Sequence, residues 1–319
     1  MTKISVNYMA DNSDSSLFRN GKVLIKRDVD GSDADSKGVN LTNYELNLLN
    51  AREYKGEQTI SLNANGFELA HNTLNNSAID FFDNQQIIKS YYPECAEIIK
   101  EKTDANRVFV FDHNIRSATG KKNGKRIAGG QLVQGPAHVV HGDYTLKSAP
   151  DRIEQLSNPL GENDTLQNPS GKNNGALSKN LVRDIRDGRR FSIINLWRNI
   201  VTDPVEVNPI GLCDASTVST NDLVVFEIHY DDRVGENYFA KYNKKHQWYY
   251  YPKMTRDEAL LIKQWDSLGG FAHTNGKSSD YEVPQKPSTF SFHSAFNDPN
   301  AKHDAPDRWS IEVRCVVVY

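Results

Sequence analysis

The chain has little cysteine, little methionine and almost no net charge. Its 319 residues include three cysteines and three methionines, and the formal net charge is -3. The widely separated thiols Cys95, Cys213 and Cys315 fit neither a disulfide framework nor a zinc cluster. A near-neutral charge gives no electrostatic reason to expect nucleic acid or a membrane surface as a partner. We therefore expect a reducing, cytoplasmic setting, a small-molecule substrate, and a monomer or homodimer.

Long apolar runs are also missing. No stretch approaches the roughly 20 apolar residues that a membrane-spanning helix needs, and residues 1–5 show no apolar core of a signal peptide. The length suits one large domain or two modest ones. We expect a single domain over residues 1–319, in which residues 1–105 form a helical and loop support region and residues 106–319 form the core.

Apolar runs of moderate length are frequent in the second part of the chain. We predict strands at 107–112, 138–145, 191–198, 223–230, 236–242, 246–251, 289–293 and 311–319. Helical spacing appears at 41–52, 87–102 and 177–186, and a capping box at Thr255 and Glu258 predicts a helix through Trp265. The polar segments 1–40 and 158–172 are predicted as loops, and the basic segment 119–126 as a hairpin tip or a lid. This pattern predicts a mainly β barrel with flanking helices.

The most informative motif is His141-x-Asp143, within a run expected to be a strand. Because side chains alternate along a strand, the imidazole and the carboxylate point to the same face. Two such ligands and a distant histidine make the 2-His-1-carboxylate triad of non-haem Fe(II) oxygenases, which leaves room for a cosubstrate and O2. The motif alone is weak, because such pairs are usually surface contacts, and His229-x-Asp231 is a second example.

The C-terminal part supplies the missing groups. His293 ends a predicted strand, and Arg308 and Ser310 then share one face by the same alternation. An arginine fork can hold a carboxylate with two hydrogen bonds, and a serine hydroxyl adds another donor. This arrangement suits the distal carboxylate of 2-oxoglutarate.

Several stretches resemble the hydroxylase/desaturase family of Fe(II)/2-oxoglutarate oxygenases of secondary metabolism, which includes cephem methoxylase-related and gibberellin desaturase-like proteins. The resemblance covers roughly residues 107–319 and lies in His141-Gly142-Asp143-Tyr144-Thr145 and in residues 194–200, 212–214, 232–236, 246–250, 257–267, 293–296 and 310–314. It implies a double-stranded β-helix fold (jelly-roll, cupin-like). It also implies Fe(II), 2-oxoglutarate and O2 as cofactor and cosubstrates.

The same resemblance implies roles for individual residues. His141, Asp143 and His293 would bind iron, and His141 is favoured over His229. Arg308, supported by Ser310, would bind 2-oxoglutarate, with Arg314 on the same face as the rival for this role. Further residues are candidates for the substrate pocket, although aromatic side chains are as often barrel core: Tyr144, Trp197, Arg198, Trp248 and Tyr250. Arg198 could instead pair with Asp214.

The expected activity is oxidation of a C–H bond of a small metabolite, such as an amino-acid derivative. The outcome would be hydroxylation, desaturation or oxidative cyclisation, and the sequence does not choose among them. One alternative is a cupin-type metal dioxygenase that uses no 2-oxoglutarate, against which the carboxylate of Asp143 argues. The other is a non-catalytic binding barrel, against which the complete ligand set argues.

Overall fold

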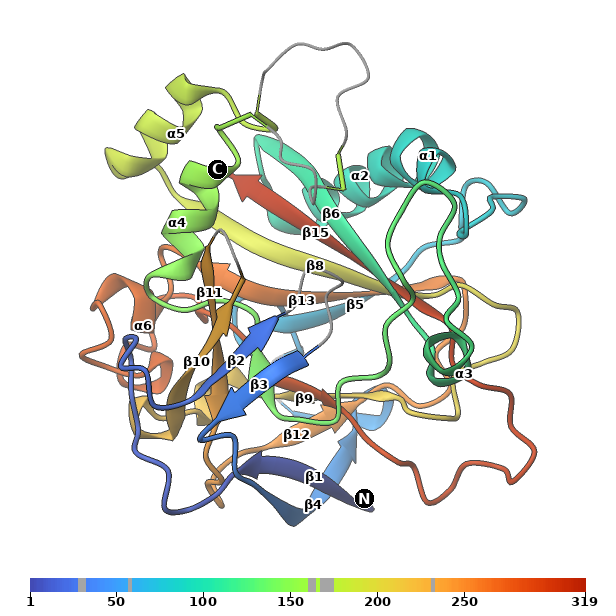
Figure 1. The fold of residues 1–319 in the computed structure, drawn as a ribbon, viewed down its shortest axis with the longest axis horizontal. Coiled ribbons are helices and arrows are strands. Elements are labelled where there is room, and N and C mark those ends of the chain that lie inside the picture. The colour runs from blue at the N-terminus through green and yellow to red at the C-terminus, as the bar shows by residue number, and fades with distance from the viewer. Residues whose placement is uncertain (28–32, 57–58, 160–164, 167–174, 231–232) are drawn as a thin grey trace.

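Two β-sheets form the body of the protein in the computed structural model, which describes residues 1–27, 33–56, 59–159, 165–166, 175–230 and 233–319 (Figure 1). The large sheet contains β1 (Thr2–Met9), β2 (Leu24–Arg27), β3 (Asp33–Lys37), β4 (Leu41–Asn50), β7 (His141–Gly142), β9 (Ile210–Cys213), β10 (Leu223–His229), β11 (Val234–Ala240), β12 (Trp248–Tyr250) and β14 (His293–Ala295). The small sheet contains β5 (Phe67–His71), β6 (Arg107–Arg116), β8 (Phe191–Asn199), β13 (Glu258–Asp266) and β15 (Ser310–Val318).

The strand orders follow from the pairing of these strands. The order is β1-β4-β12-β9-β14-β7-β11-β10-β2-β3 in the large sheet and β5-β13-β8-β15-β6 in the small sheet. The α-helices are α1 (Asn84–Gln86), α2 (Tyr92–Thr103), α3 (Ala118–Lys122), α4 (Ser148–Gln155), α5 (Lys179–Arg186) and α6 (Gly270–His273). Short 3-10 or π turns are η1 (Ala51–Glu53), η2 (Ile87–Tyr91), η3 (Ala215–Thr217), η4 (Thr220–Asp222) and η5 (Asp280–Glu282). Among the described residues, no helix is long and apolar enough to cross a membrane.

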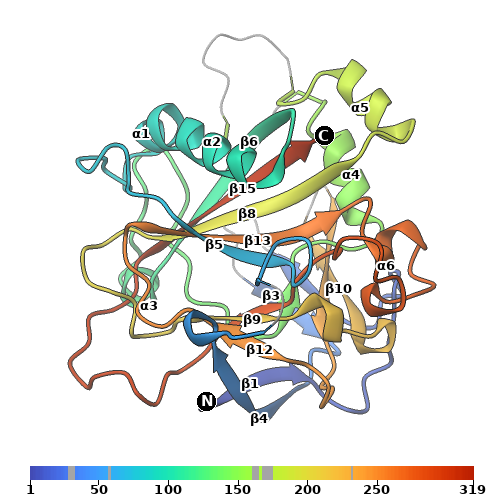
Figure 2. The same cartoon turned by 180° about the vertical axis from the view of Figure 1, so that it is seen from behind.

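The central strands of the small sheet are buried on both faces. Every residue of β8 and β13 is buried, as is every residue of β15 except Arg314. One face looks toward the large sheet, and α2 covers the other (Figure 2). On the covered face, Ile98 and Ile99 of α2 share a core cluster with Leu196 and Val313. Strands enclosed in this way are near-continuous apolar runs, and the sequence predicts two of them, β8 and β15, as strands.

The helix predicted at 41–52 is wrong, because most of this segment is strand β4. The strand pairs antiparallel with β1, with Leu48 opposite Thr2 and Leu41 opposite Met9. Its leucine spacing fits a period of two as well as a helical period, and pairing with β1 decides the outcome. Because β1 and β4 join the large sheet and β5 joins the small one, residues 1–105 are not only the helical and loop support that the sequence predicts.

The helix predicted from Thr255 through Trp265 is also wrong. The Thr255 backbone amide does donate to Glu258 Oε2, at 2.9 Å. The chain then enters the small sheet as β13, with Leu260 between Leu69 of β5 and Trp197 of β8. A short apolar run has the same appearance in a buried helix and in a strand covered on both faces, so this segment was ambiguous.

Two other expected helices are confirmed, whereas the loop predicted at 1–40 is wrong, because this segment contains β1, β2 and β3. Helices occur within 87–102 and 177–186, as η2 with α2 and as α5. The basic segment 119–126, predicted as a hairpin tip or a lid, instead begins within α3. The predicted strand at 138–145 is reduced to β7, and that at 289–293 is replaced by β14, which begins at His293. Much of the predicted loop at 158–172 lies outside the described residues.

A buried histidine connects α2 to the small sheet and predicts an acid-linked loss of stability. His113 Nδ1 on β6 lies 2.8 Å from the Tyr92 hydroxyl at the start of α2. Burial lowers the pKa of His113 to about 4, from an ordinary 6.5. Between about pH 6.5 and pH 4, this imidazole is protonated in the unfolded chain but remains neutral in the folded protein. The free energy of unfolding therefore falls as the pH drops through this range.

We expect His113→Gln to remove about one proton from this linked uptake. The measurement is the pH dependence of the urea-unfolding free energy between neutral pH and the acid limit of folding. His273→Gln, at an exposed histidine, is the control. A slope that His113→Gln leaves unchanged would contradict the assignment.

Candidate metal centre

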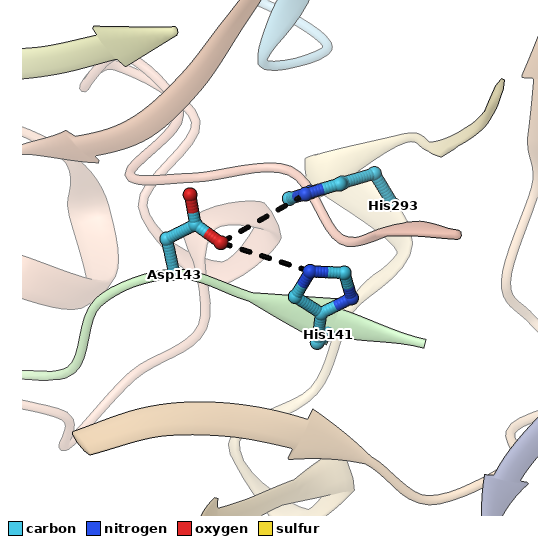
Figure 3. A group of neighbouring side chains, drawn as sticks. All are labelled: His141, Asp143 and His293. Carbon is cyan, nitrogen blue, oxygen red and sulfur yellow. Dashed lines mark ion pairs between the residues drawn. The ribbon is translucent and has the colours of Figure 1, made fainter. Parts of the chain in front are cut away.

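His141, Asp143 and His293 converge on one point between the sheets (Figure 3). Asp143 Oδ1 lies 3.7 Å from His141 Nε2 and 3.9 Å from His293 Nε2. One possible ligand atom from each residue lies within 4.8 Å of the other two. His293 on β14 pairs directly with His141 on β7, so both side chains point to the same face of the large sheet. The pairing of these strands thus brings together residues that are far apart in the sequence.

Asp143 itself lies just beyond β7, so strand alternation is not what fixes it. Its backbone amide donates to Gln264 Oε1 on β13, at 3.2 Å. With its side-chain amide turned to donate, Asn237 Nδ2 on β11 lies 3.1 Å from the Asp143 carbonyl oxygen. The loop that carries the carboxylate is therefore held by one strand from each sheet.

The hydrogen bonds of the two histidines direct a lone pair toward Asp143. His141 Nδ1 lies 2.8 Å from the Val139 carbonyl oxygen, and His293 Nδ1 lies 3.4 Å from that of Ser291. A carbonyl only accepts, so we assign the proton of each ring to Nδ1 and the lone pair to Nε2. Burial lowers the pKa of both imidazoles, to about 4 for His141. Both rings are therefore neutral ligands at neutral pH.

The second oxygen of Asp143 is held from the small sheet. Asn195 Nδ2 donates to Asp143 Oδ2 at 2.8 Å, and Arg314 Nε lies 3.8 Å from the same oxygen. Burial opposes ionisation, but His293, Arg314, His141 and the Asn195 hydrogen bond together hold the pKa of Asp143 below its usual value. The centre thus offers two neutral imidazole nitrogens and one carboxylate oxygen, which is the donor set of non-haem Fe(II) sites.

Arg314 and Asn195 belong to one row of side chains across the small sheet. Arg314 of β15 stands opposite Asp112 of β6 and opposite Asn195 of β8. Its Nη1 lies 2.6 Å from Asp112 Oδ2, and its Nη2 lies 3.4 Å from Glu312 Oε1. This guanidinium is therefore already occupied by carboxylates of the protein. No role was predicted for Asn195, although a carboxamide inside the apolar run 191–197 is a signal that a buried hydrogen-bond partner exists.

We expect Asn195→Ala to weaken binding of a divalent metal by about 10- to 100-fold, as is typical when a partner of a metal ligand is removed. The measurement is anaerobic titration of the metal-free protein with Fe(II) or Co(II). The matched control is Asn199→Ala, because Asn199 is buried on the same strand but donates to the Asp203 and Met254 carbonyl oxygens. Equal metal affinity in wild type and Asn195→Ala would remove this residue from the centre.

A second feature is a buried arginine that no carboxylate of the described residues pairs with. Arg308 is 3% exposed, its Nη1 donates to the Asn208 carbonyl oxygen, and its Nε has no hydrogen-bond partner. The guanidinium carbon lies 5.7 Å from the centre of the Trp197 ring. Burial, with the nearby charge of Arg116, lowers the pKa of Arg308 to about 9. Burying a charge without a partner costs free energy. An anion bound beside the Arg308 guanidinium would therefore be stabilised.

Arg116 is a further arginine near the centre, for which the sequence predicted no role. It ends β6 opposite Ser310, and its Nη1 donates to the Gly135 carbonyl oxygen at 2.9 Å. Its charge contributes to the lowered pKa of His141, His293 and Arg308. Among the described residues, Arg116 also has no carboxylate within ion-pair distance. Arg116 therefore adds positive charge to the region between the triad and Arg308.

Of the predicted pocket residues, two lie near this region. Trp197 shares a face of β8 with Asn195 and contacts Arg308. Tyr144 follows Asp143, and burial raises its pKa to about 12, so it is a neutral phenol.

The other three predicted pocket residues point elsewhere, which corrects the prediction. Arg198 lies on the opposite face of β8, with Nη2 3.3 Å from Glu94 Oε1 of α2, so it pairs neither with substrate nor with Asp214. Leu212 and Cys213 are consecutive residues of β9, so their side chains point to opposite faces of the large sheet. His293 stands opposite Leu212, whereas Trp248 stands opposite Cys213. Trp248 and Tyr250 therefore lie on the far face of the large sheet.

Hydrogen bonds confirm this placement of the two aromatic residues. Trp248 Nε1 donates to the Tyr8 hydroxyl at 2.9 Å, and the Tyr250 hydroxyl lies 3.2 Å from Thr2 Oγ1. The competing motif is also elsewhere: His229 Nε2 lies 2.9 Å from Glu227 Oε2, and Asp231 lies outside the described residues.

Comparison with known proteins relates the chain to a family of oxidoreductases. A family model described as an oxidoreductase/YMDC permease-like domain matches residues 6–318. A protein of Methylophilus leisingeri named "uncharacterized protein in dcmA 3′ region" is 43% identical over 196 residues, which cover 61% of this chain and 89% of that protein. The alpha-ketoglutarate-dependent dioxygenase phiK of a fungal species is 28% identical over 322 residues, covering 98% of this chain and 95% of that protein.

The fold is shared with a solved structure. The iron and alpha-ketoglutarate-dependent endoperoxidase NvfI superposes with a TM-score of 0.71 at 20% sequence identity, covering 99% of this chain and 98% of that one. This match confirms the predicted jelly-roll fold. Since the family model matches almost the whole chain, the protein belongs to the oxidoreductase/YMDC permease-like family, and the resemblance to the Fe(II)/2-oxoglutarate oxygenases is confirmed.

Proposed function

We propose that this protein is a non-haem Fe(II)/2-oxoglutarate-dependent dioxygenase that oxidises a C–H bond of a small metabolite. His141, Asp143 and His293 hold the metal, and Arg308 receives the distal carboxylate of 2-oxoglutarate. The observation that carries the proposal is the pairing of two features: a neutral-neutral-anionic ligand set and a buried guanidinium without a carboxylate partner among the described residues. When bound, Fe(II), 2-oxoglutarate and O2 supply the oxidising power to remove a hydrogen atom from the substrate.

The protein's own residues prepare the geometry of that chemistry. His141 and His293 present Nε2 lone pairs because their Nδ1–H groups donate hydrogen bonds to backbone carbonyl oxygens. Asn195 and Arg314 hold one oxygen of Asp143 and leave the other for the metal. Three ligands on one side leave the remaining positions to small molecules. The burial of both histidines excludes bulk water from these positions.

Arg308, and not Arg314, is assigned to the cosubstrate in this proposal. Arg314 is surrounded by the carboxylates of Asp112, Glu312 and Asp143. Adding a further carboxylate there would oppose like charges, whereas at Arg308 it would neutralise an unpaired charge. The buried Ser310 follows Arg308 by two residues, and Arg116 stands opposite Ser310 on the neighbouring strand β6. Both increase the affinity of this region for an anion.

The unpaired Arg308 also separates this proposal from a metal dioxygenase that uses no 2-oxoglutarate, since that enzyme would need no such anion site. Hydroxylation, desaturation and oxidative cyclisation all begin with cleavage of a C–H bond, so the proposal covers each. We also propose that the protein is located in the cytoplasm and is a monomer or a homodimer. The buried, unpaired thiols of Cys95, Cys213 and Cys315 support a reducing compartment.

The test is anaerobic titration of the metal-free protein with Fe(II) and then with 2-oxoglutarate. Chelation of Fe(II) by a 2-oxo acid is expected to produce a weak visible charge-transfer absorption in wild type and none in Asp143→Ala. Bound iron without this absorption would favour a dioxygenase that uses no 2-oxoglutarate. A protein that binds no iron would favour the alternative of a non-catalytic binding barrel.

A further inference from the structure

A cavity of about 530 Å³ is lined in part by Val139 and Phe239, which are neighbours of His141 along the chain and across the sheet. Its walls come from β2, β3, β10 and β11, from the start of β4 and the residues just before it, and from a residue just before β7. The apolar lining consists chiefly of Ile25, Val39, Leu41, Val139, Phe226 and Phe239. A cavity of this volume falls within the usual range of small-molecule sites, about 300 to 1,000 Å³.

Strand register places this cavity next to the triad. Phe239 of β11 stands directly opposite His141 of β7, on whose other side His293 pairs. Residues directly opposite each other point to the same face of a sheet, so Phe239 and both histidines share one face. The strands are about 5 Å apart. The lining therefore begins one strand away from a proposed metal ligand.

Val139 approaches the same point along the chain. It precedes His141 by two residues, about 7 Å in an extended segment, and its carbonyl oxygen accepts the hydrogen bond of His141 Nδ1. The cavity thus adjoins His141 in two directions, through Phe239 and through Val139. The triad residues themselves are not among its lining residues, so the cavity suits a part of a ligand away from the reacting atom.

The chemistry of the lining selects an apolar ligand. Phe226 and Phe239 stack with ring centres 4.2 Å apart and an interplanar angle of 10°, which gives a flat wall. The polar lining consists of the exposed Asp35 and Ser36. No cation lines the cavity among the described residues, and a carboxylate placed against this wall would lose hydration without a partner.

We propose that this cavity binds the hydrocarbon body of an uncharged, largely apolar substrate and presents one of its carbons to the metal centre. The inference rests on the proposed function and narrows its substrate class. Binding energy gathered on a remote apolar part can position the reacting carbon. A free amino acid, which carries two charges, does not fit such a wall.

The probe for the test is 4-fluorobiphenyl, an uncharged apolar compound observed by fluorine NMR. We expect it to bind the wild-type protein, and Leu41→Arg to weaken its binding at least tenfold by adding a charge at the cavity mouth. Val39→Trp is expected to weaken binding as strongly by filling the space. Leu132→Arg is the matched control, because Leu41 and Leu132 are 45% and 44% exposed and Leu132 does not line the cavity. Zwitterionic 4-fluorophenylalanine is expected to bind at least tenfold more weakly than 4-fluorobiphenyl.

The second readout is proximity to the metal. Paramagnetic Mn(II) is expected to broaden the signal of the bound probe in wild type, and not in Asp143→Ala. Failure of the probe to bind wild type, equal binding by both cavity variants, or absence of broadening with Mn(II) bound would each overturn the inference. Binding with broadening, but without the absorption of an Fe(II)/2-oxoglutarate complex, would reject the proposed reaction and retain the cavity as an apolar site beside the metal.

Discussion

Replacing Asp143 with asparagine is expected to abolish stable Fe(II) binding and to reduce 2-oxoglutarate consumption to the background rate. The substitution keeps the shape of the side chain but removes the anionic ligand between two neutral imidazoles. It also leaves a single acceptor oxygen, which can face either the metal or the Asn195 and Arg314 side chains but not both. His141→Ala and His293→Ala are expected to have the same effect. The measurements are the iron content after anaerobic loading and desalting, and the rate of succinate formation.

His229→Ala is the control for these variants, because His229 belongs to the competing motif and bonds to Glu227. It should retain full iron content. Circular dichroism of the metal-free proteins separates loss of the metal from loss of the fold. Retained succinate formation with full iron dependence in either histidine variant would remove that residue from the triad.

The second large effect is expected from Arg308→Lys, which should raise the half-saturating concentration of 2-oxoglutarate by about 10- to 100-fold. Hydrogen bonds to charged groups contribute about 1.5 to 3 kcal/mol, and lysine cannot reproduce the two-pronged contact of a guanidinium with a carboxylate. The buried position of Arg308 makes the loss larger than at a surface site. The measurement is the dependence of succinate formation on 2-oxoglutarate concentration at saturating Fe(II).

Arg314→Lys provides the comparison, since the structure gives that arginine a different partner. Its Nε lies 3.8 Å from Asp143 Oδ2, so its replacement should weaken Fe(II) binding and leave the requirement for 2-oxoglutarate nearly unchanged. The opposite pattern, with the requirement raised in Arg314→Lys and unchanged in Arg308→Lys, would move the cosubstrate role to Arg314.

The three residues of the candidate metal centre could be predicted from the sequence, by a short motif and by a resemblance. His141 and Asp143 form a short motif, and His293 lies in a matching stretch of the family resemblance. The central strands β8 and β15 were likewise predictable, since strands buried on both faces are apolar throughout. These features can be read from short stretches of sequence without knowing which strands pair with one another.

The features that could not be predicted depend on pairing and on which face a residue occupies. Leu46 and Leu48 fit a helix or a strand until β1 pairs with β4. Trp248 and Arg198 lie in correctly predicted strands, yet each points away from the centre, because alternation alone does not say which set of side chains faces inward.

The supporting groups of the centre were the hardest to foresee. Asn195 lies on β8, whereas Asp112 and Arg116 lie on β6, and their roles appear only when β15 lies between these two strands.

The position of β15 has a consequence for synthesis of the protein. It is the latest strand of the small sheet in the sequence, yet it lies between β8 and β6. A nascent chain leaves the ribosome from its N-terminal end, so β6 and β8 emerge before β15. The edges of β6 and β8 that pair with β15 therefore stay unpaired until residues 310–318 have been made. Such edges pair readily with the wrong strand. Chaperone protection should therefore matter most in this interval, and the proposed metal centre would reach its final geometry only after Arg314 has approached Asp143.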